Sequence, residues 1–155
     1  MMVIVTQCVT HAAVTVEGAI AGEIDRGLLV YVGVSQEDTP ADAEWAARKV
    51  AQLRVFADDA GKLNCAVGDI AGGVLAISNF TLLGDGRKGN RPSYVAAAKP
   101  DHAKPLFDQF VSELKLHAIP VATGVFGAHM LIDAQADGPV NLILQSPGGV
   151  TGGSS

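Results

Sequence analysis

The residues best placed to do chemistry lie where an apolar run ends, in the segment Ser78-Asn79-Phe80-Thr81-Leu82. The hydroxyl of Thr81 could act as a nucleophile. Threonine is a weak nucleophile unless a base or a free amino terminus activates it, and none of the four histidines sits beside it in the sequence. The competing interpretation is a strand end whose polar groups satisfy their neighbours.

A second polar segment, Asp137-Gly138-Pro139-Val140, opens the last apolar run. Proline cannot donate a hydrogen bond to a strand ladder, so Pro139 is expected at the first residue of a strand or on an edge strand. Taken alone, the Gly138-Pro139 pair favours a type I or type II turn, because only about 5–6% of X–Pro bonds in folded proteins are cis.

Positive charge gathers only at Arg87, Lys88 and Arg91, while the chain as a whole has a net charge of −5 and a pI near 5.2. Proteins that grip a long run of nucleic-acid phosphates usually present a basic face. We therefore expect no DNA binding, and any RNA contact has to be local. From charge alone, the simpler interpretation of this segment is a solvated loop.

The sequence gives no sign of a metal or an organic cofactor. Cys8 and Cys65 form no Cys-x-x-Cys pair and lie at no ligand spacing from a histidine, so reduced thiols are expected. No apolar stretch approaches the roughly 20 residues of a membrane span, and no secretory leader is recognisable, which favours the cytoplasm. Surface or satisfied strand positions are expected for the histidines: His11, His102, His117 and His129.

The elements that must position these segments are mostly strands. Alternating or continuous apolar residues predict strands at Val14 and Val16 and in the ranges 19–24, 28–34, 74–78, 126–135 and 140–145. Thr39-Pro40 is a good helix start, and that helix is expected to run to about Phe56. A second helix carries apolar residues at helical spacing from Ala103 to Leu114, and Pro105 means that it either begins there or lacks one early hydrogen bond.

These elements predict an α+β fold with two main helices and a mixed, largely antiparallel sheet. The length of 155 residues and the apolar content of 48% suit one domain with a packed core, which we place at residues 1–145. The glycine- and serine-rich residues 146–155 are expected to form a flexible tail.

Together with Arg87-Lys88-Gly89-Asn90-Arg91-Pro92-Ser93 and Thr123-Gly124-Val125-Phe126-Gly127, the two segments above resemble the D-aminoacyl-tRNA deacylase family in identity, order and spacing, from about Val3 to Gln145. The resemblance implies hydrolysis of the ester between a D-amino acid and the 3′ end of tRNA, a proofreading reaction of translation. It implies a barrel-like sheet, a homodimer with two sites at its interface, and no metal or organic cofactor.

The resemblance also assigns roles to residues. Backbone N–H groups near Phe80 and Thr81 would hold the ester carbonyl, with Ser78 and Asn79 orienting that segment, while a hydroxyl of the terminal ribose shares the proton transfer. The Gly138-Pro139 bond would be cis and enter the partner's pocket, where its carbonyls capture the amino group and exclude an L side chain. Phe126 could stack on the terminal adenine or belong to the core, and Arg87, Lys88 and Arg91 would contact tRNA.

This chain departs from the family pattern at several positions. Asn79 stands where glutamine is usual, Cys8 where an arginine is thought to brace the Gly-Pro loop, and Ala136 and Asn141 replace an asparagine and a threonine around Gly138-Pro139. Two rival functions therefore stay open. One is a deacylase for a small L-aminoacyl-tRNA such as L-Ala-tRNA, and the other is a non-catalytic dimer that binds RNA ends or nucleotides.

Overall fold

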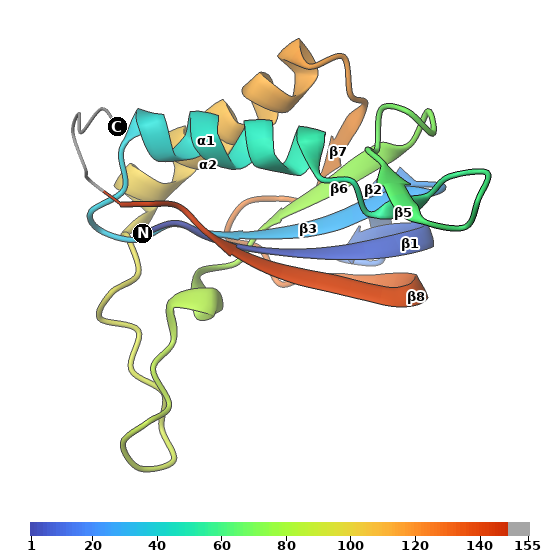
Figure 1. Cartoon of the computed structure of the whole chain (residues 1–155). Helices are drawn as coiled ribbons and strands as arrows, with labels where there is room; N and C mark the ends of the chain where they lie inside the picture. The colour runs from blue at the N-terminus through green and yellow to red at the C-terminus, as the bar shows by residue number, and fades with distance from the viewer. Residues whose placement is uncertain (149–155) are drawn as a thin grey trace, which may run out of the picture.

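The computed structural model describes residues 1–148. One six-stranded mixed sheet has the strand order β2-β1-β3-β6-β7, with β8 also paired to β1, and two helices lie together over one of its faces (Figure 1). The elements are β1 (Val3–Val16), β2 (Ala19–Ile24), β3 (Gly27–Gly33), α1 (Pro40–Gln52), β4 (Phe56–Ala57), β5 (Leu63–Cys65), β6 (Gly73–Ser78), the 3-10 helix η1 (Phe80–Leu83), α2 (Pro100–Leu116), β7 (Val121–Thr123) and β8 (Leu131–Gln145).

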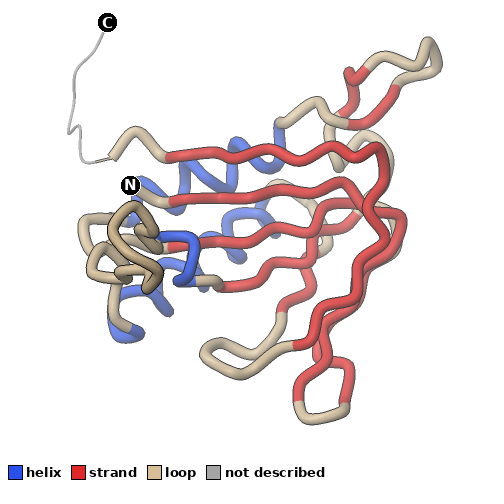
Figure 2. The backbone as a smooth tube through the Cα atoms, turned by 90° about the horizontal axis from the view of Figure 1, so that it is seen from below, coloured by secondary structure: helices blue, strands red, loops and turns tan. Residues whose placement is uncertain are grey.

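The long strand β1 organises the sheet because it changes partner along its length. Its first half, Val3–Val9, pairs with β3, and its second half from Ala12 onward pairs with β2, while β8 follows both halves on the other side. These three pairings are antiparallel, whereas β3–β6 and β6–β7 are parallel. The change of partner lets the strands bend, and the sheet curls (Figure 2). The predicted α+β class with a largely antiparallel, barrel-like sheet is confirmed.

The curled sheet nearly closes, since its two end strands approach each other at Gly22 in β2 and Thr123 in β7. A Cβ atom placed on Gly22 would lie 2.4 Å from the carbonyl oxygen of Thr123. Only glycine lets the two backbones come this close. The closure also holds β7 in place, and the loop after β7 forms one wall of the pocket described below.

We expect Gly22→Ala to lower the free energy of unfolding by about 1–3 kcal/mol, because the added methyl group has to push β2 and β7 apart. Urea unfolding followed by circular dichroism measures this change. Gly68→Ala is the matched control, because a Cβ atom at Gly68 meets nothing within 4 Å. Equal stability of the two variants would mean that the two strands separate without cost.

Apolar residues fill both sides of the sheet. The larger cluster lies under the helices, where Phe110 and Leu114 of α2 are fully buried, and the smaller one includes Val14 and Leu75 on the opposite face. Helix α1 begins as predicted with Thr39 and Asp42 forming a capping box. Helix α2 begins at Pro100, so Pro105 lies inside it and the helix lacks one early hydrogen bond.

Several predicted boundaries were wrong. Helix α1 ends at Gln52 instead of Phe56, because Phe56 pairs with Cys65 to form the short β4–β5 hairpin. The strand predicted at 126–135 begins only at Leu131, and it continues through Pro139 to Gln145 as the single strand β8. A buried strand run and a loop that packs against a core look alike in a single sequence. Two- and three-residue strands such as β4, β5 and β7 leave too short a pattern to detect.

The end of the predicted domain fits the end of β8 at Gln145, but Ser146 belongs to the packed body. Its hydroxyl accepts a hydrogen bond from the backbone N–H of Met2 at 2.8 Å. Burial alone would raise the pKa of Asp42, but hydrogen bonds from Ser146 and Thr39 outweigh burial and lower it. Residues 149–155 of the predicted tail lie outside the described residues. Within residues 1–148, no helix is both long and apolar enough to cross a membrane.

Candidate active site

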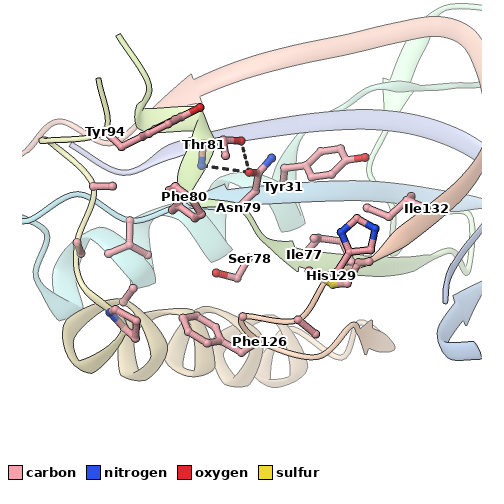
Figure 3. A pocket seen from close by; sticks show the side chains of 18 residues that line it. Tyr31, Ile77, Ser78, Asn79, Phe80, Thr81, Tyr94, Phe126, His129 and Ile132 are labelled. Carbon is pink, nitrogen blue, oxygen red and sulfur yellow. Dashed lines mark hydrogen bonds between the residues drawn. The ribbon is translucent and has the colours of Figure 1, made fainter. Parts of the chain in front are cut away.

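A cavity of about 790 Å³ opens where β6 ends. Its walls come from the segment after β6, the loop between β7 and β8, and the start of α2 (Figure 3). Ser78, Asn79, Phe80, Thr81 and Phe126 all line it, so the structure brings together five of the residues singled out from the sequence. The other lining residues are Tyr31, Val34, Ile77, Tyr94, Ala97, Ala98, Pro100, Ala103, Gly127, Ala128, His129, Met130 and Ile132.

Asn79 fixes the shape of the segment after β6. Its backbone N–H donates to the carbonyl oxygen of Val32 at 2.8 Å, which extends the β3–β6 pairing by one residue. Its side-chain oxygen accepts one hydrogen bond from the backbone N–H of Thr81 at 3.2 Å and another from the Thr81 hydroxyl (Figure 3). Such a side-chain cap is the usual reason for asparagine at the start of a helical turn.

These bonds decide which groups can meet a substrate. The Thr81 hydroxyl donates to Asn79, an amide that cannot act as a general base, so nothing here activates Thr81 as a nucleophile. The Thr81 N–H is also engaged, although at the long distance of 3.2 Å. The backbone N–H of Phe80 has no hydrogen-bond partner among the described residues. Phe80 therefore offers the free donor for a carbonyl oxygen or a developing oxyanion.

The described lining of the cavity contains no acid, lysine or arginine. His129 is the one histidine of this described lining, and it lies beside Ile132 at the end of the cavity away from Tyr94 (Figure 3). The surface position predicted for His129 is confirmed, because the residue is exposed, but no sequence pattern signals that it also lines this cavity. Tyr31 lies at the same end, and burial raises the pKa of its hydroxyl. The site therefore contains little acid or base of its own.

Phe126 lies between the core and the cavity. Its ring packs against Phe107 of α2, with a centroid distance of 6.3 Å, and also lines the cavity. Gly124 lets the loop pack closely against Met130, because a Cβ atom at Gly124 would lie 2.5 Å from the Met130 sulfur. Phe126 is thus a wall residue held from behind by the core, which suits a surface on which a flat ring can stack.

Gly138-Pro139 is not part of this cavity. Gln7 pairs with Asn141 and Val9 with Ala136, so the four residues 137–140 of β8 bulge out opposite Cys8 alone. The bond is cis, as the resemblance implied, and β8 pairs with β1 alone among the described strands, as expected for a strand that contains proline. Gly138 and Pro139 are both exposed. The turn between two separate strands that the local pattern favoured is wrong.

Cys8 sits under this bulge and is buried, with its thiol 3.5 Å from the carbonyl oxygen of Val55. Burial raises the pKa of the thiol, and the charge of Asp137 adds to the effect. No side-chain hydrogen bond to residues 137–139 occurs among the described residues. The bulge is therefore held by its backbone and by packing, without the guanidinium that the family pattern places at this position.

The basic residues lie on the long segment between η1 and α2, which extends away from the body (Figure 1). Backbone hydrogen bonds of 2.8 Å between Asp85 and Ser93 close its base. The guanidinium of Arg87 donates to both carboxylate oxygens of Asp85, at 2.9 and 2.7 Å, and lowers the pKa of Asp85 to about 2. Arg87 is thus already paired, whereas Lys88 and Arg91 form no ion pair within residues 1–148.

No group of three or more histidine, cysteine, aspartate or glutamate side chains is placed to share a metal ion among the described residues. The cavity instead combines an unused backbone donor, flat aromatic walls and an open mouth. That arrangement can hold a carbonyl group and an unpaired base.

The family model described as D-Tyr-tRNA(Tyr) deacylase matches residues 5–145. The chain belongs to this family. A D-aminoacyl-tRNA deacylase of Chloroherpeton thalassium is 50% identical to it over 94% of this chain and 97% of that protein. A D-aminoacyl-tRNA deacylase of Deinococcus deserti is 52% identical over 92% of this chain and 98% of that protein.

Solved structures share the fold of this chain. The structure titled c-Myc DNA Unwinding Element Binding Protein superimposes with a TM-score of 0.87 at 38% identity, covering 95% of this chain and 99% of that chain. A probable eukaryotic D-amino acid tRNA deacylase superimposes with a TM-score of 0.81 and covers 93% of this chain and 99% of that chain. At 14% identity, this second likeness speaks for the fold alone.

Proposed function

We propose that the protein hydrolyses the ester bond of D-aminoacyl-tRNA, and of Gly-tRNA, and so removes wrongly charged amino acids before translation uses them. The observation that carries this proposal is the full-length match, at about 50% identity, to relatives with that name. The family segment at residues 78–82 also lines the cavity in this chain. Neither rival function has comparable support.

In the proposed reaction, water adds to the ester carbonyl and the bond from the carbonyl carbon to the ribose oxygen breaks, with that oxygen taking up a proton. The Phe80 N–H faces the negative charge that develops on the carbonyl oxygen. Asn79 and Ser78 hold the segment in shape, and Thr81 contributes through its hydrogen bonds to Asn79. Because the described lining offers no general base at this point, the neighbouring hydroxyl of the terminal ribose assists the proton transfer.

The protein acts as a homodimer in this proposal. The bulge at Gly138-Pro139 faces outward on an edge strand that also exposes Leu131 (62% exposed) and Ile143 (73% exposed). Apolar residues exposed along an unpaired edge favour a protein interface. In a partner's pocket, the backbone carbonyls at Gly138-Pro139 would bind the substrate amino group and reject an L side chain by a clash that cannot relax. Gly-tRNA would also be accepted, because glycine has no side chain that could clash.

The 3′ end of tRNA is the second partner. Phe126 offers a flat ring to the terminal adenine. The segment with Lys88 and Arg91, together with the paired Arg87, connects Thr81 and Tyr94, which both line the cavity. No membrane and no DNA enter the proposal. We place the reaction in the cytoplasm, where charged tRNA is used.

The deciding experiment compares hydrolysis of D-Tyr-tRNA, L-Tyr-tRNA and L-Ala-tRNA by the purified protein. We expect D-Tyr-tRNA to be hydrolysed and L-Tyr-tRNA to be left intact. Rapid loss of L-Ala-tRNA with an intact D-Tyr-tRNA would establish the first rival function, and no hydrolysis of any substrate would establish the second. Sedimentation showing an active monomer below micromolar concentration would defeat the dimer.

Binding of uncharged tRNA should depend only weakly on salt. With Arg87 already paired to Asp85, Lys88 and Arg91 are the two free cations of the cluster 87–91, so log K should fall with log[salt] at a slope of about −1.4 by the single-strand coefficient. Fluorescence anisotropy from 50 to 300 mM salt measures the slope. A slope steeper than about −5 would reveal a basic surface that the charge distribution does not suggest.

A further inference from the structure

Two exposed aromatic rings stand at the mouth of the cavity, at the end away from His129 (Figure 3). Phe80 is 56% exposed and Tyr94 is 41% exposed, and their rings meet at 5.3 Å with an interplanar angle of 74°. In such an edge-to-face pair, one ring uses only its edge and the other only one face, so flat ring surface stays available. Exposed large apolar groups of this kind indicate a binding surface.

The position of Tyr94 is fixed by the base of the basic segment. Tyr94 directly follows the backbone bonds between Asp85 and Ser93, and its ring packs on Gly84, where an added Cβ atom would lie 2.9 Å from the ring. Phe80 is held at the start of η1 by the Asn79 turn. The pair therefore forms a fixed step between the cavity and the segment that carries Lys88 and Arg91.

We propose that Phe80 and Tyr94 stack the base of the penultimate nucleotide of the tRNA 3′ end, while Lys88 and Arg91 contact the phosphates before it. The inference rests on the proposed function, which puts the terminal nucleotide in the cavity against Phe126. The next unpaired nucleotide of that strand then has to leave through the mouth, where it meets aromatic surface first and positive charge next. Proteins hold single strands by stacking the bases on aromatic side chains and by placing cations along the phosphate backbone.

Specificity follows from the same contacts. Stacking accepts every base because every base has a flat π surface, so the step binds the unpaired 3′ end common to charged tRNAs without reading the rest of the molecule. A pairing partner on the penultimate base would keep it away from the rings. The step thus selects single-stranded 3′ ends.

The test measures binding of an uncharged RNA minihelix with the unpaired 3′ end of tRNA, and of the same RNA with an abasic ribose at the penultimate position. Fluorescence anisotropy gives Kd for both. With the natural protein, we expect loss of the base to weaken binding about tenfold, the scale of one base stacked on an aromatic ring. Tyr94→Ala should weaken binding of the intact RNA by a similar factor, and the abasic change should then add no more than about twofold.

Two further variants separate stacking from other roles of Tyr94. Tyr94→Phe keeps the ring and should restore the tenfold difference between the two RNAs. Val95→Ala changes an apolar neighbour that is 78% exposed and outside the cavity lining, and it should bind both RNAs like the natural protein. Independent, multiplicative losses from Tyr94→Ala and the abasic ribose would overturn the proposal, as would an abasic RNA that binds normally.

The rings could instead be covered by the partner subunit, and the same samples decide this. In that case Tyr94→Ala would shift the sedimentation of the dimer and weaken both RNAs equally, which would overturn the proposal. Because the measurement uses uncharged RNA, it does not depend on turnover. Failure to hydrolyse D-Tyr-tRNA would defeat the proposed function, whereas loss of the base effect would defeat only the stacking step.

Discussion

D-Tyr-tRNA whose terminal ribose lacks the free hydroxyl beside the ester will be hydrolysed at least ~100-fold more slowly than the natural substrate, the usual scale of acid–base assistance. The expectation follows from what the cavity lacks. Its described lining has no acid, lysine or arginine, the Thr81 hydroxyl is tied to Asn79, and His129 lies beside Ile132 at the end away from Tyr94. The substrate must therefore supply the hydroxyl that relays the proton. Single-turnover rates on the two substrates measure the effect.

Thr81→Ala is the matched protein variant for this experiment. Removal of the hydroxyl deletes one of the two hydrogen bonds that Asn79 accepts, while the bond from the Thr81 N–H is kept. We expect most activity to remain, with a loss of less than about tenfold, because the hydroxyl supports only the geometry of the turn. Full activity on the deoxy substrate, or inactivity of Thr81→Ala, would return Thr81 to the role of nucleophile.

The sequence predicted the strand and helix types well where the apolar pattern was long. The helical spacing from Ala103 to Leu114 and the run in β3 both appear where expected, because a long pattern leaves only one face to bury. It failed around Pro139, where the local residues favour a turn. The long register with β1 overrides that preference and carries β8 straight through the bulge. The local sequence of a strand carries no information about the strand with which it pairs.

The residues of the candidate site were also predicted only in part from the sequence. The residue types at 78–82 and at Phe126 indicated a common site because their order resembles a known family, and the cavity brings them together. The hydrogen bonds of Asn79, which leave Phe80 as the free donor, depend on side-chain geometry one methylene shorter than the usual glutamine. The place of His129 and the burial of Cys8 depend on tertiary packing. Neither could be read from spacing.

Gly138→Ala is expected to lower kcat/KM for D-Tyr-tRNA about 100-fold, the cost of a displacement of roughly 1 Å at a reacting centre. Gly138 has a φ of +127°, and a Cβ atom there would lie 2.7 Å from the backbone N of Val140. The bulge must shift, and with it the carbonyls that we propose capture the amino group. The control is Gly18→Ala, a turn glycine with φ of +80° and no atom within 4 Å of an added Cβ, which should leave the kinetics unchanged.

Mixed dimers show whether the bulge serves its own pocket or the partner's. Asn79→Asp places a carboxylate at the Thr81 N–H, next in the chain to the Phe80 donor, where its charge opposes the developing oxyanion, so this variant should also be nearly inactive. After subunit exchange between Gly138→Ala and Asn79→Asp, a mixed dimer contains one site with a natural pocket and a natural bulge from the other subunit. Random exchange makes half of the dimers mixed, so about a quarter of natural activity should return. If each bulge served its own pocket, every site would carry one defect and mixing would restore nothing.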